Sequence, residues 1–149
     1  MFRLRPFIPD DFDTLWALDQ ICFPGGIAYS RAELRLFINA ATALTLVAIA
    51  PDDVIAGFVV SDVQRNRGHL ITIDVHPDHR RAGLGSMLML AVERRLCELG
   101  VKDLRLEVAV DNVAALSFYK RHGYSLVRTI PRYYNQSVDA LLMSKPLVD

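Results

Sequence analysis

The sequence lacks the features of a disulfide scaffold, a membrane protein or a polyanion-binding protein. Its two cysteines, Cys22 and Cys97, form no spacing motif, which disfavours a disulfide framework. No apolar run reaches the roughly 18–20 residues that cross a bilayer, and no long apolar signal-peptide core follows the first methionine. Lysine plus arginine and aspartate plus glutamate both number 17. The chain therefore lacks the net positive charge that favours binding to nucleic acid. We expect a soluble, cytoplasmic protein that binds neither nucleic acid nor membrane.

The composition that remains is that of an ordinary globular protein. Hydrophobic residues make up 52% of the chain and charged residues 23%, which is enough to build a buried core. The 149 residues match the usual size of one domain, about 100–150 residues. No internal repeat, low-complexity tract or linker divides them. The sequence therefore predicts a single domain over residues 1–149.

Hydrophobic periodicity predicts alternating strands and helices. Apolar residues recur at helical spacing over 84–99, and Gly100 follows as a stop signal. Apolar and polar residues alternate over 104–108, as in a strand with one polar face. Ser30 and Glu33 form a capping-box pattern that starts the second helix. The expected order is β-α-α-β-β-β-α-β-α-β-β, with strands near 2–5, 43–50, 54–63, 69–75, 104–108, 124–130 and 138–143, and helices near 9–22, 30–39, 84–99 and 112–122. This order is an α/β fold, with helices flanking a mixed, mostly antiparallel sheet.

A glycine-rich turn joins the expected strand at 69–75 to the helix at 84–99. Its residues 80–85 read Arg-Arg-Ala-Gly-Leu-Gly. Glycines let backbone N–H groups converge on an anion, and a helix start carries about half a positive charge. The turn lacks the Gly-Lys-Ser/Thr of a P-loop and the glycine spacing of a dinucleotide-binding fold. Taken alone, it fits either a pyrophosphate site or a turn in which glycine allows close packing.

Two longer patterns favour the pyrophosphate site. The run 75–85 resembles the first cofactor motif of GCN5-related (GNAT) N-acetyltransferases, Arg/Gln-x-x-Gly-x-Gly/Ala after a strand that ends in Val-x-Pro. A second motif of that family is matched at Asn112, Ala115, Tyr119, Gly123 and Tyr124. The resemblance is closest to the ribosomal-protein-alanine and other protein N-terminal acetyltransferases. It implies a GNAT fold and an acetyl-CoA-dependent N-acyltransferase that moves an acetyl group to a primary amine.

The same resemblance implies where acetyl-CoA binds. The strand end at 73–75 would present backbone groups to the cofactor arm, with one N–H polarising the thioester carbonyl. The turn would hold the pyrophosphate. The expected cofactor-binding residues are Ile73, Asp74, Val75, Arg80, Arg81, Ala82, Gly83, Leu84, Gly85, Ser86 and Asn112. No metal is expected, because His76, Asp78 and His79 lie in a turn without a fourth ligand nearby.

Two catalytic residues are also implied by the resemblance. Tyr119 would lie beside the cofactor sulfur and give a proton to the departing thiolate; phenols have a pKa of about 10 and thiols of about 8.5. The alternative is a tyrosine that only packs in the core. Glu107 would be the base, and its alternative is a surface partner of Arg105. Asp74 is a rival base, because a mid-strand carboxylate is unusual without a partner, and His69 is a further candidate.

The acceptor side of the site is predicted from two loops. Tyr133 and Tyr134 lie in the segment 130–135, which is expected to join the last two strands and resembles the peptide-holding loop of N-terminal acetyltransferases. Packing of the two rings under a hairpin is the alternative. Gly25 and Gly26 follow Phe-Pro, where the alanine acetyltransferases have tryptophan, so the acceptor wall is more open. Three functions fit: acetylation of a protein or peptide N-terminus, acetylation of a small-molecule amine, and acyl-CoA binding without catalysis.

Overall fold

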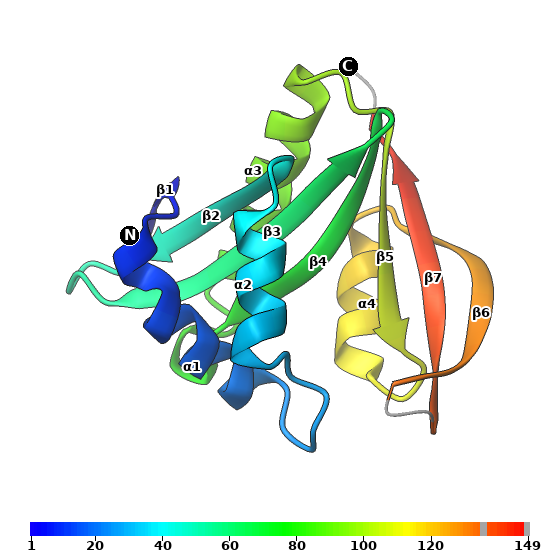
Figure 1. Cartoon of the computed structure of the whole chain (residues 1–149), viewed down its shortest axis with the longest axis horizontal. Coiled ribbons are helices and arrows are strands. Elements are labelled where there is room, and N and C mark those ends of the chain that lie inside the picture. Colours follow the sequence, from blue (N-terminus) through cyan, green and yellow to red (C-terminus); the bar gives the residue numbers. More distant parts are fainter. Residues whose placement is uncertain (135–136, 148–149) are drawn as a thin grey trace.

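The computed structural model describes residues 1–134 and 137–147. Seven strands form one sheet in the order β1-β2-β3-β4-β5-β7-β6, and four α-helices cover its faces (Figure 1). The strands are β1 (Arg3–Pro6), β2 (Ala43–Ile49), β3 (Ile55–Gln64), β4 (Arg67–Val75), β5 (Asp103–Ala109), β6 (Ser125–Tyr134) and β7 (Val138–Pro146). The helices are α1 (Phe12–Cys22), α2 (Arg31–Asn39), α3 (Leu84–Glu98) and α4 (Val113–Arg121), with short 3-10 turns at Pro9–Asp11 and Pro77–His79. The expected element order is confirmed.

The sheet is mixed because one of its neighbouring pairs is parallel. Strands β4 and β5 run in parallel through three residue pairs, from Arg67↔Asp103 to His69↔Arg105. All the other neighbouring strands are antiparallel. Beyond His69 the strands β4 and β5 diverge (Figure 1). The second half of β4 therefore has a strand partner, β3, on one edge and leaves its other edge available to the rest of the molecule.

A β-bulge at Ile71 changes which face each β4 side chain occupies. Ser61 of β3 pairs with Leu70 and Val60 pairs with Thr72, so Ile71 is one residue in excess. An extra residue reverses the side-chain alternation that follows it. Leu70 lies in the core under α3, and Ile73 and Val75, beyond the bulge, pack against that same core. The bulge therefore turns Thr72 and Asp74 towards α1.

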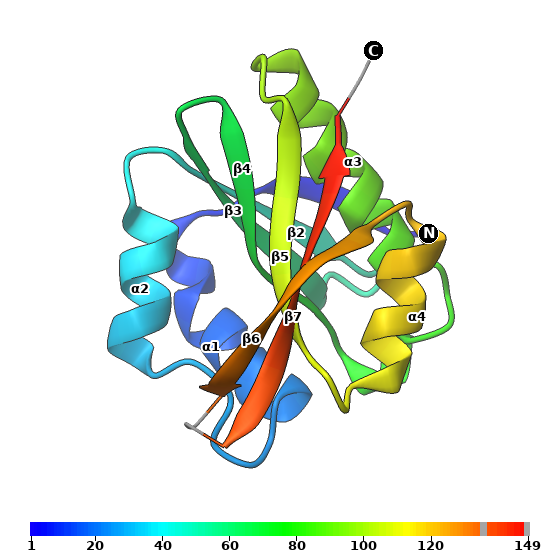
Figure 2. The same cartoon turned by 90° about the vertical axis from the view of Figure 1, so that its right-hand side faces the viewer.

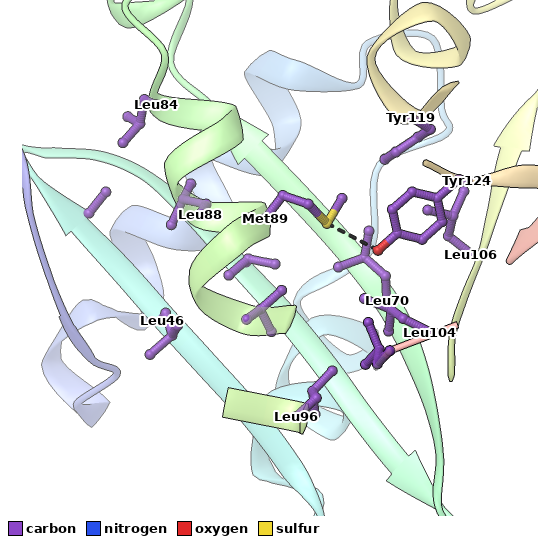
Figure 3. Packing of buried hydrophobic residues seen from close by; sticks show 14 of the residues in the cluster. Leu46, Leu70, Leu84, Leu88, Met89, Leu96, Leu104, Leu106, Tyr119 and Tyr124 are labelled. Atoms are coloured by element: carbon purple, nitrogen blue, oxygen red, sulfur yellow. Dashed lines mark hydrogen bonds between the residues drawn. The ribbon is translucent and has the colours of Figure 1, made fainter. Parts of the chain in front are cut away.

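Two hydrophobic cores lie on opposite faces of the sheet. The cluster under α3 and α4 includes Leu84, Leu88, Met89, Tyr119 and Tyr124 (Figure 3), and the Tyr124 hydroxyl lies 3.4 Å from the Met89 sulfur. A smaller cluster under α1 and α2 is built from residues such as those at 12, 15, 34 and 58. Figure 2 shows the two helix pairs on either side of the sheet. In the described part of the chain, no helix is both long and apolar enough to cross a membrane.

The end of β6 differs from the expected loop at 130–135. Pairing with β7 is interrupted after Ile130↔Ala140 and resumes at Tyr134↔Val138. Pro131 has no N–H to donate to the ladder. Arg132 takes a positive φ of 54°, and its N–H donates to the Asp139 carboxylate at 2.9 Å. Tyr133 and Tyr134 are therefore held at the end of a strand rather than in an open loop, and Asn135 falls outside the described residues.

Candidate active site

A cavity of about 780 Å³ lies where β4 and β5 diverge. Its wall is formed by the second half of β4, the turn that precedes α3, the middle of β5, the start of α4 and the segment between α1 and α2. The predicted site residues that line it are Ile73, Val75, Arg80, Arg81, Gly83, Leu84, Gly85, Ser86, Glu107, Asn112, Tyr119 and Tyr134. Asp74, Ala82 and Tyr133 are not in its lining. Residues from the two distant sequence motifs thus meet around one space.

The turn before α3 has the shape of an anion cradle. Arg81 and Gly83 both have positive φ, 66° and 78°, and Gly83 is the N-cap of α3. The helical ladder begins with the Met87 N–H donating to the Gly83 carbonyl. The N–H groups of residues 84–86 precede that bond, so the helix itself does not use them, and they carry the positive end of its dipole. These donors, with two arginines beside them, fit a pyrophosphate.

Close packing of α3 against α4 fixes the position of this cradle. A Cβ at Gly85 would lie 3.3 Å from the Phe118 ring, whereas a Cβ at Gly83 would meet no atom within 4 Å. Glycine is thus needed at position 85 because α4 packs closely there, and at position 83 because the backbone takes a positive φ. Ser86 shares a hydrogen bond of 2.9 Å with His122 Nε2, and burial lowers the pKa of His122. Close packing is therefore one role of the glycine turn, and it leaves the N–H groups of residues 84–86 available to an anion.

The free edge of β4 presents backbone groups to the cavity. The carbonyl of Ile71 accepts from the Tyr29 hydroxyl at 3.3 Å, and that of Val75 accepts from Arg80 Nε at 3.0 Å and from Cys22 Sγ at 3.4 Å. Alternate residues of a strand direct their N–H and C=O to the same edge. Ile73 therefore presents its backbone groups between these two carbonyls, at the position where an N–H could polarise a thioester.

Asp74 occupies a different position from the one expected. Its carbonyl is directed at β3, because a Cβ on Gly57 would lie 2.6 Å from that oxygen. Its carboxyl is 1% exposed and accepts a hydrogen bond from the Thr72 hydroxyl. Burial, and next hydrogen bonding to Asp19, raise its pKa well above the usual range. The bulge turns Asp74 towards α1, and Asp74 is not in the lining of the cavity. This placement argues against both a cofactor contact and a catalytic base.

Glu107 lies on the wall of the cavity and is paired with His69. Its Oε1 lies 2.7 Å from His69 Nε2, and His69 is the last residue of β4 that pairs with β5. The partner of Glu107 is thus His69 and not Arg105, which was the alternative to a catalytic role. Burial first, and then the nearby Glu107 carboxylate, raise the pKa of Tyr133. Two of the proposed base candidates thus contact each other.

Tyr119 is buried between the cofactor motif and the acceptor side. It is 9% exposed, its ring packs edge-on against Phe118 and Tyr124, and it lines the cavity. Burial, with smaller contributions from Tyr134 and Asp74, raises its pKa. The phenol therefore retains its proton at neutral pH, as a proton donor must. The ring packs in the core and also lines the cavity, so the two interpretations of Tyr119 are compatible.

Asn112 combines a structural role with an open donor. It is the N-cap of α4, and its Oδ1 accepts from the Ala115 N–H at 3.2 Å. The capping bond orients the side chain at the cavity wall and uses the oxygen, while the side-chain NH₂ remains able to donate. A contact between Asn112 and the cofactor arm is therefore compatible with its role as a cap.

Tyr29 is a site residue that the sequence did not single out. Its N–H donates to Asp19 Oδ2 at 2.9 Å, its carbonyl accepts from Gln20 Nε2 at 2.8 Å, and its ring packs on Phe37. With the hydroxyl on Ile71, these contacts anchor the end of the α1–α2 segment against β4. The available signal was an aromatic residue directly before the Ser30 cap. Gly25 and Gly26 lie further back in the same segment; both are exposed and have positive φ.

The family follows from a comparison with known proteins. A model of the acetyltransferase (GNAT) family matches residues 12–124, which include both cofactor motifs. The chain belongs to the acetyltransferase (GNAT) family. As a GNAT protein it is an N-acetyltransferase, and the family prediction made from the two motifs is confirmed.

Named relatives and solved structures agree with this assignment. The [ribosomal protein bS18]-alanine N-acetyltransferase of Salmonella typhimurium is 29% identical over 140 residues, 92% of each chain. The N-alpha-acetyltransferase 30 of Schizosaccharomyces pombe is 30% identical over 116 residues, which cover 75% of this chain and 77% of its own.

Among solved structures, the ribosomal-protein-S18-alanine N-acetyltransferase from Escherichia coli has a TM-score of 0.90 and 24% identity, covering 100% of this chain and 96% of its own. Arabidopsis thaliana NAA60 in complex with acetyl-CoA has a TM-score of 0.86 and 20% identity, covering 99% of each chain. Both show the same fold as this GNAT protein, so the predicted GNAT fold is also confirmed.

Proposed function

We propose that this GNAT protein transfers the acetyl group of acetyl-CoA to the α-amine of a protein or peptide N-terminus. The observation that carries the proposal is a group of tyrosines around one carboxylate. Tyr29, Tyr133 and Tyr134 all lie close enough to Glu107 for its charge to raise their pKa values, after burial as the main cause. Hydroxyl groups can pair with peptide amides, and a carboxylate attracts an ammonium. The names of the two sequence relatives describe N-terminal and alanine acetylation.

Acetyl-CoA fits the cradle and the edge of β4. The N–H groups of residues 84–86, with Arg81, would hold its pyrophosphate. Asn112 would donate to the pantetheine arm, which would run along the free edge of β4. The backbone N–H of Ile73 would stabilise the negative charge that develops on the thioester oxygen. When bound, acetyl-CoA supplies the activated acetyl thioester, and the protein supplies its orientation.

Two side chains would move the protons of the reaction. Glu107 would take one proton from the acceptor ammonium, so that the amine nitrogen can attack the thioester carbon. The C–S bond then breaks, and Tyr119 would give its phenolic proton to the departing thiolate sulfur. The nitrogen loses a second proton as the amide forms. Transfer of this proton to the Tyr119 phenolate would restore the charge balance. Glu107 and Tyr119 both line the cavity, so both can serve one bound pair of substrates.

An α-amine is an easier acceptor than a lysine side chain. Their usual pKa values are about 7.7–8.0 and about 10.4, a difference that costs lysine roughly 3.5 kcal/mol more to deprotonate at neutral pH. An N-terminus is already partly neutral there, so one carboxylate such as Glu107 suffices as the base. The lower cost of deprotonating an α-amine thus agrees with the peptide N-terminus that the tyrosines favour as acceptor.

A CoA-release assay tests the proposal directly. A peptide with a free N-terminus should react faster than the same peptide with a blocked N-terminus and an internal lysine. Tyr134→Ala should raise the KM for the peptide and leave the affinity for acetyl-CoA unchanged. Faster turnover of a polyamine or an amino sugar than of any peptide would overturn the proposal in favour of a small-molecule acceptor.

A further inference from the structure

A second cavity, of about 580 Å³, adjoins the first and shares Glu107 with it. His69 lines this second cavity, so the pair of 2.7 Å described above stands at the boundary between the two. Four arginines line the same cavity: Arg65, Arg67, Arg105 and Arg128. The whole chain has a formal net charge of zero, so this is a local concentration of positive charge and not a consequence of composition.

The strand register gives the position of two of these arginines relative to Glu107. Glu107 pairs with Leu142 of β7, and Leu142 pairs with Arg128 of β6, so the three lie in one row across the sheet. With strands about 4.8 Å apart, Arg128 lies about 10 Å from Glu107, measured between backbones. Arg105 lies two residues along β5, about 7 Å away on the same face. The two arginines thus lie about two and three residues of extended chain from the base.

Most of this positive charge has no counter-ion in the described part of the chain. Arg67 donates to Asp103 at 3.2 Å. Within residues 1–134 and 137–147, no acidic side chain forms an ion pair with Arg65, Arg105 or Arg128. The one other carboxylate of the lining besides Glu107 is that of Asp62, which is hydrogen-bonded to the Thr42 hydroxyl and the Val63 N–H. Arginines without partners around a cavity are suited to bind carboxylates from outside.

We propose that this arginine-lined cavity binds acidic side chains at the second and third positions of the acceptor peptide. The inference rests on the proposed function, because the amine is placed at Glu107. A peptide extends by about 3.3 Å per residue, so its next two side chains fall within reach of Arg105 and Arg128. The enzyme then selects N-termini that carry aspartate or glutamate directly after the first residue, and disfavours lysine and arginine there.

Three peptides that differ only at positions 2 and 3, as Glu-Glu, Gln-Gln and Lys-Lys, test the selection in the CoA-release assay. We expect kcat/KM to fall in that order, with KM carrying most of the difference. Arg105→Gln and Arg128→Gln should each raise KM for the Glu-Glu peptide roughly three- to fivefold, the effect of a solvent-accessible ion pair of about 1 kcal/mol or less, and leave the Gln-Gln peptide unchanged. Arg94→Gln, on the exposed side of α3, makes the same charge change far from the cavity and should alter neither.

Reversal of the charge at Arg128 distinguishes a direct contact with the peptide side chains from a general effect of the protein's charge. Arg128→Glu should raise KM for the Glu-Glu peptide and lower it for the Lys-Lys peptide. Equal kcat/KM values for the three peptides with the wild-type enzyme, or equal effects of Arg94→Gln and Arg128→Gln, would overturn the subsite and leave the proposed function standing. Failure of all three peptides while a small amine reacts would overturn the proposed function itself. Thermal unfolding of each variant confirms that the folded protein is being compared.

Discussion

Replacement of Asp74 by asparagine should stabilise the protein, and the gain should grow as the pH rises. Asp74 Oδ2 and Asp19 Oδ1 are both buried, and neither has a hydrogen-bond partner among the described groups. Hydrogen bonding between these two side chains is nevertheless one cause of the raised pKa of Asp74. One proton held between the two carboxyls accounts for both observations. An asparagine amide in place of the Asp74 carboxyl supplies the same donor permanently, with almost no change in shape.

The size of the effect follows from that single proton. Because the pKa of Asp74 is raised in the folded state, the folded protein keeps a proton that the unfolded chain loses above its ordinary pKa of 3.8. The stability contribution of Asp74 is therefore greatest at low pH and falls as the pH rises towards the folded-state pKa, by about 1.4 kcal/mol per pH unit for one proton. The amide of the Asp74→Asn variant does not titrate, so the difference between variant and wild type grows by that amount per unit and then levels off.

Urea unfolding of both proteins between about pH 4 and 8 measures this difference. Asp10→Asn is the matched control, because Asp10 is exposed, and its curve should stay parallel to that of the wild type. The same experiment with acetyl transfer as readout should show activity in Asp74→Asn, since Asp74 does not line the cavity. Parallel stability curves for Asp74→Asn and wild type would refute the shared proton.

Three further substitutions test the site. Gly57→Ala places a Cβ 2.6 Å from the Asp74 carbonyl; we expect a loss of about 1–3 kcal/mol in urea unfolding and a weaker affinity for acetyl-CoA by calorimetry, because β4 must move. Tyr119→Phe should lower kcat by roughly 10²–10⁴-fold while acetyl-CoA affinity is retained, and an unchanged rate at every pH would leave Tyr119 a packing role. Glu107→Gln should lower kcat/KM most at low pH, where the amine is most protonated; a pH-independent loss would point to positioning.

The fold was predictable wherever a local rule determines the structure. The capping box at Ser30 is present in full, with the Glu33 N–H donating to Ser30 Oγ and the Ser30 N–H to Glu33 Oε1. Gly100 ends α3 with a φ of 85°. The bulge at Ile71 and the resumed pairing at Tyr134 were not predictable, because each depends on where a second strand lies.

The candidate site was also predictable only where it depends on local sequence. The cradle at 80–86 and the motif that begins at Asn112 each lie in one short stretch, so their residue types and spacing were visible in the sequence. The partnership of His69 with Glu107 joins residues on two strands that meet only after folding. The role of Tyr29 depends on three contacts from other elements. The buried position of Asp74 depends on the bulge, which reverses the face that strict alternation would assign to it.

The bulge at Ile71 also leaves β4 one residue longer than its pairing with β3 requires. Removal of Ile71 would restore simple alternation and keep Leu70, Ile73 and Val75 on the face beneath α3, with Thr72 and Asp74 still facing α1. Removal of one residue from a regularly paired part of a strand instead exchanges the faces of the residues beyond it. A scan of single-residue deletions should therefore find β4 more tolerant at Ile71 than the regularly paired part of its neighbour β3.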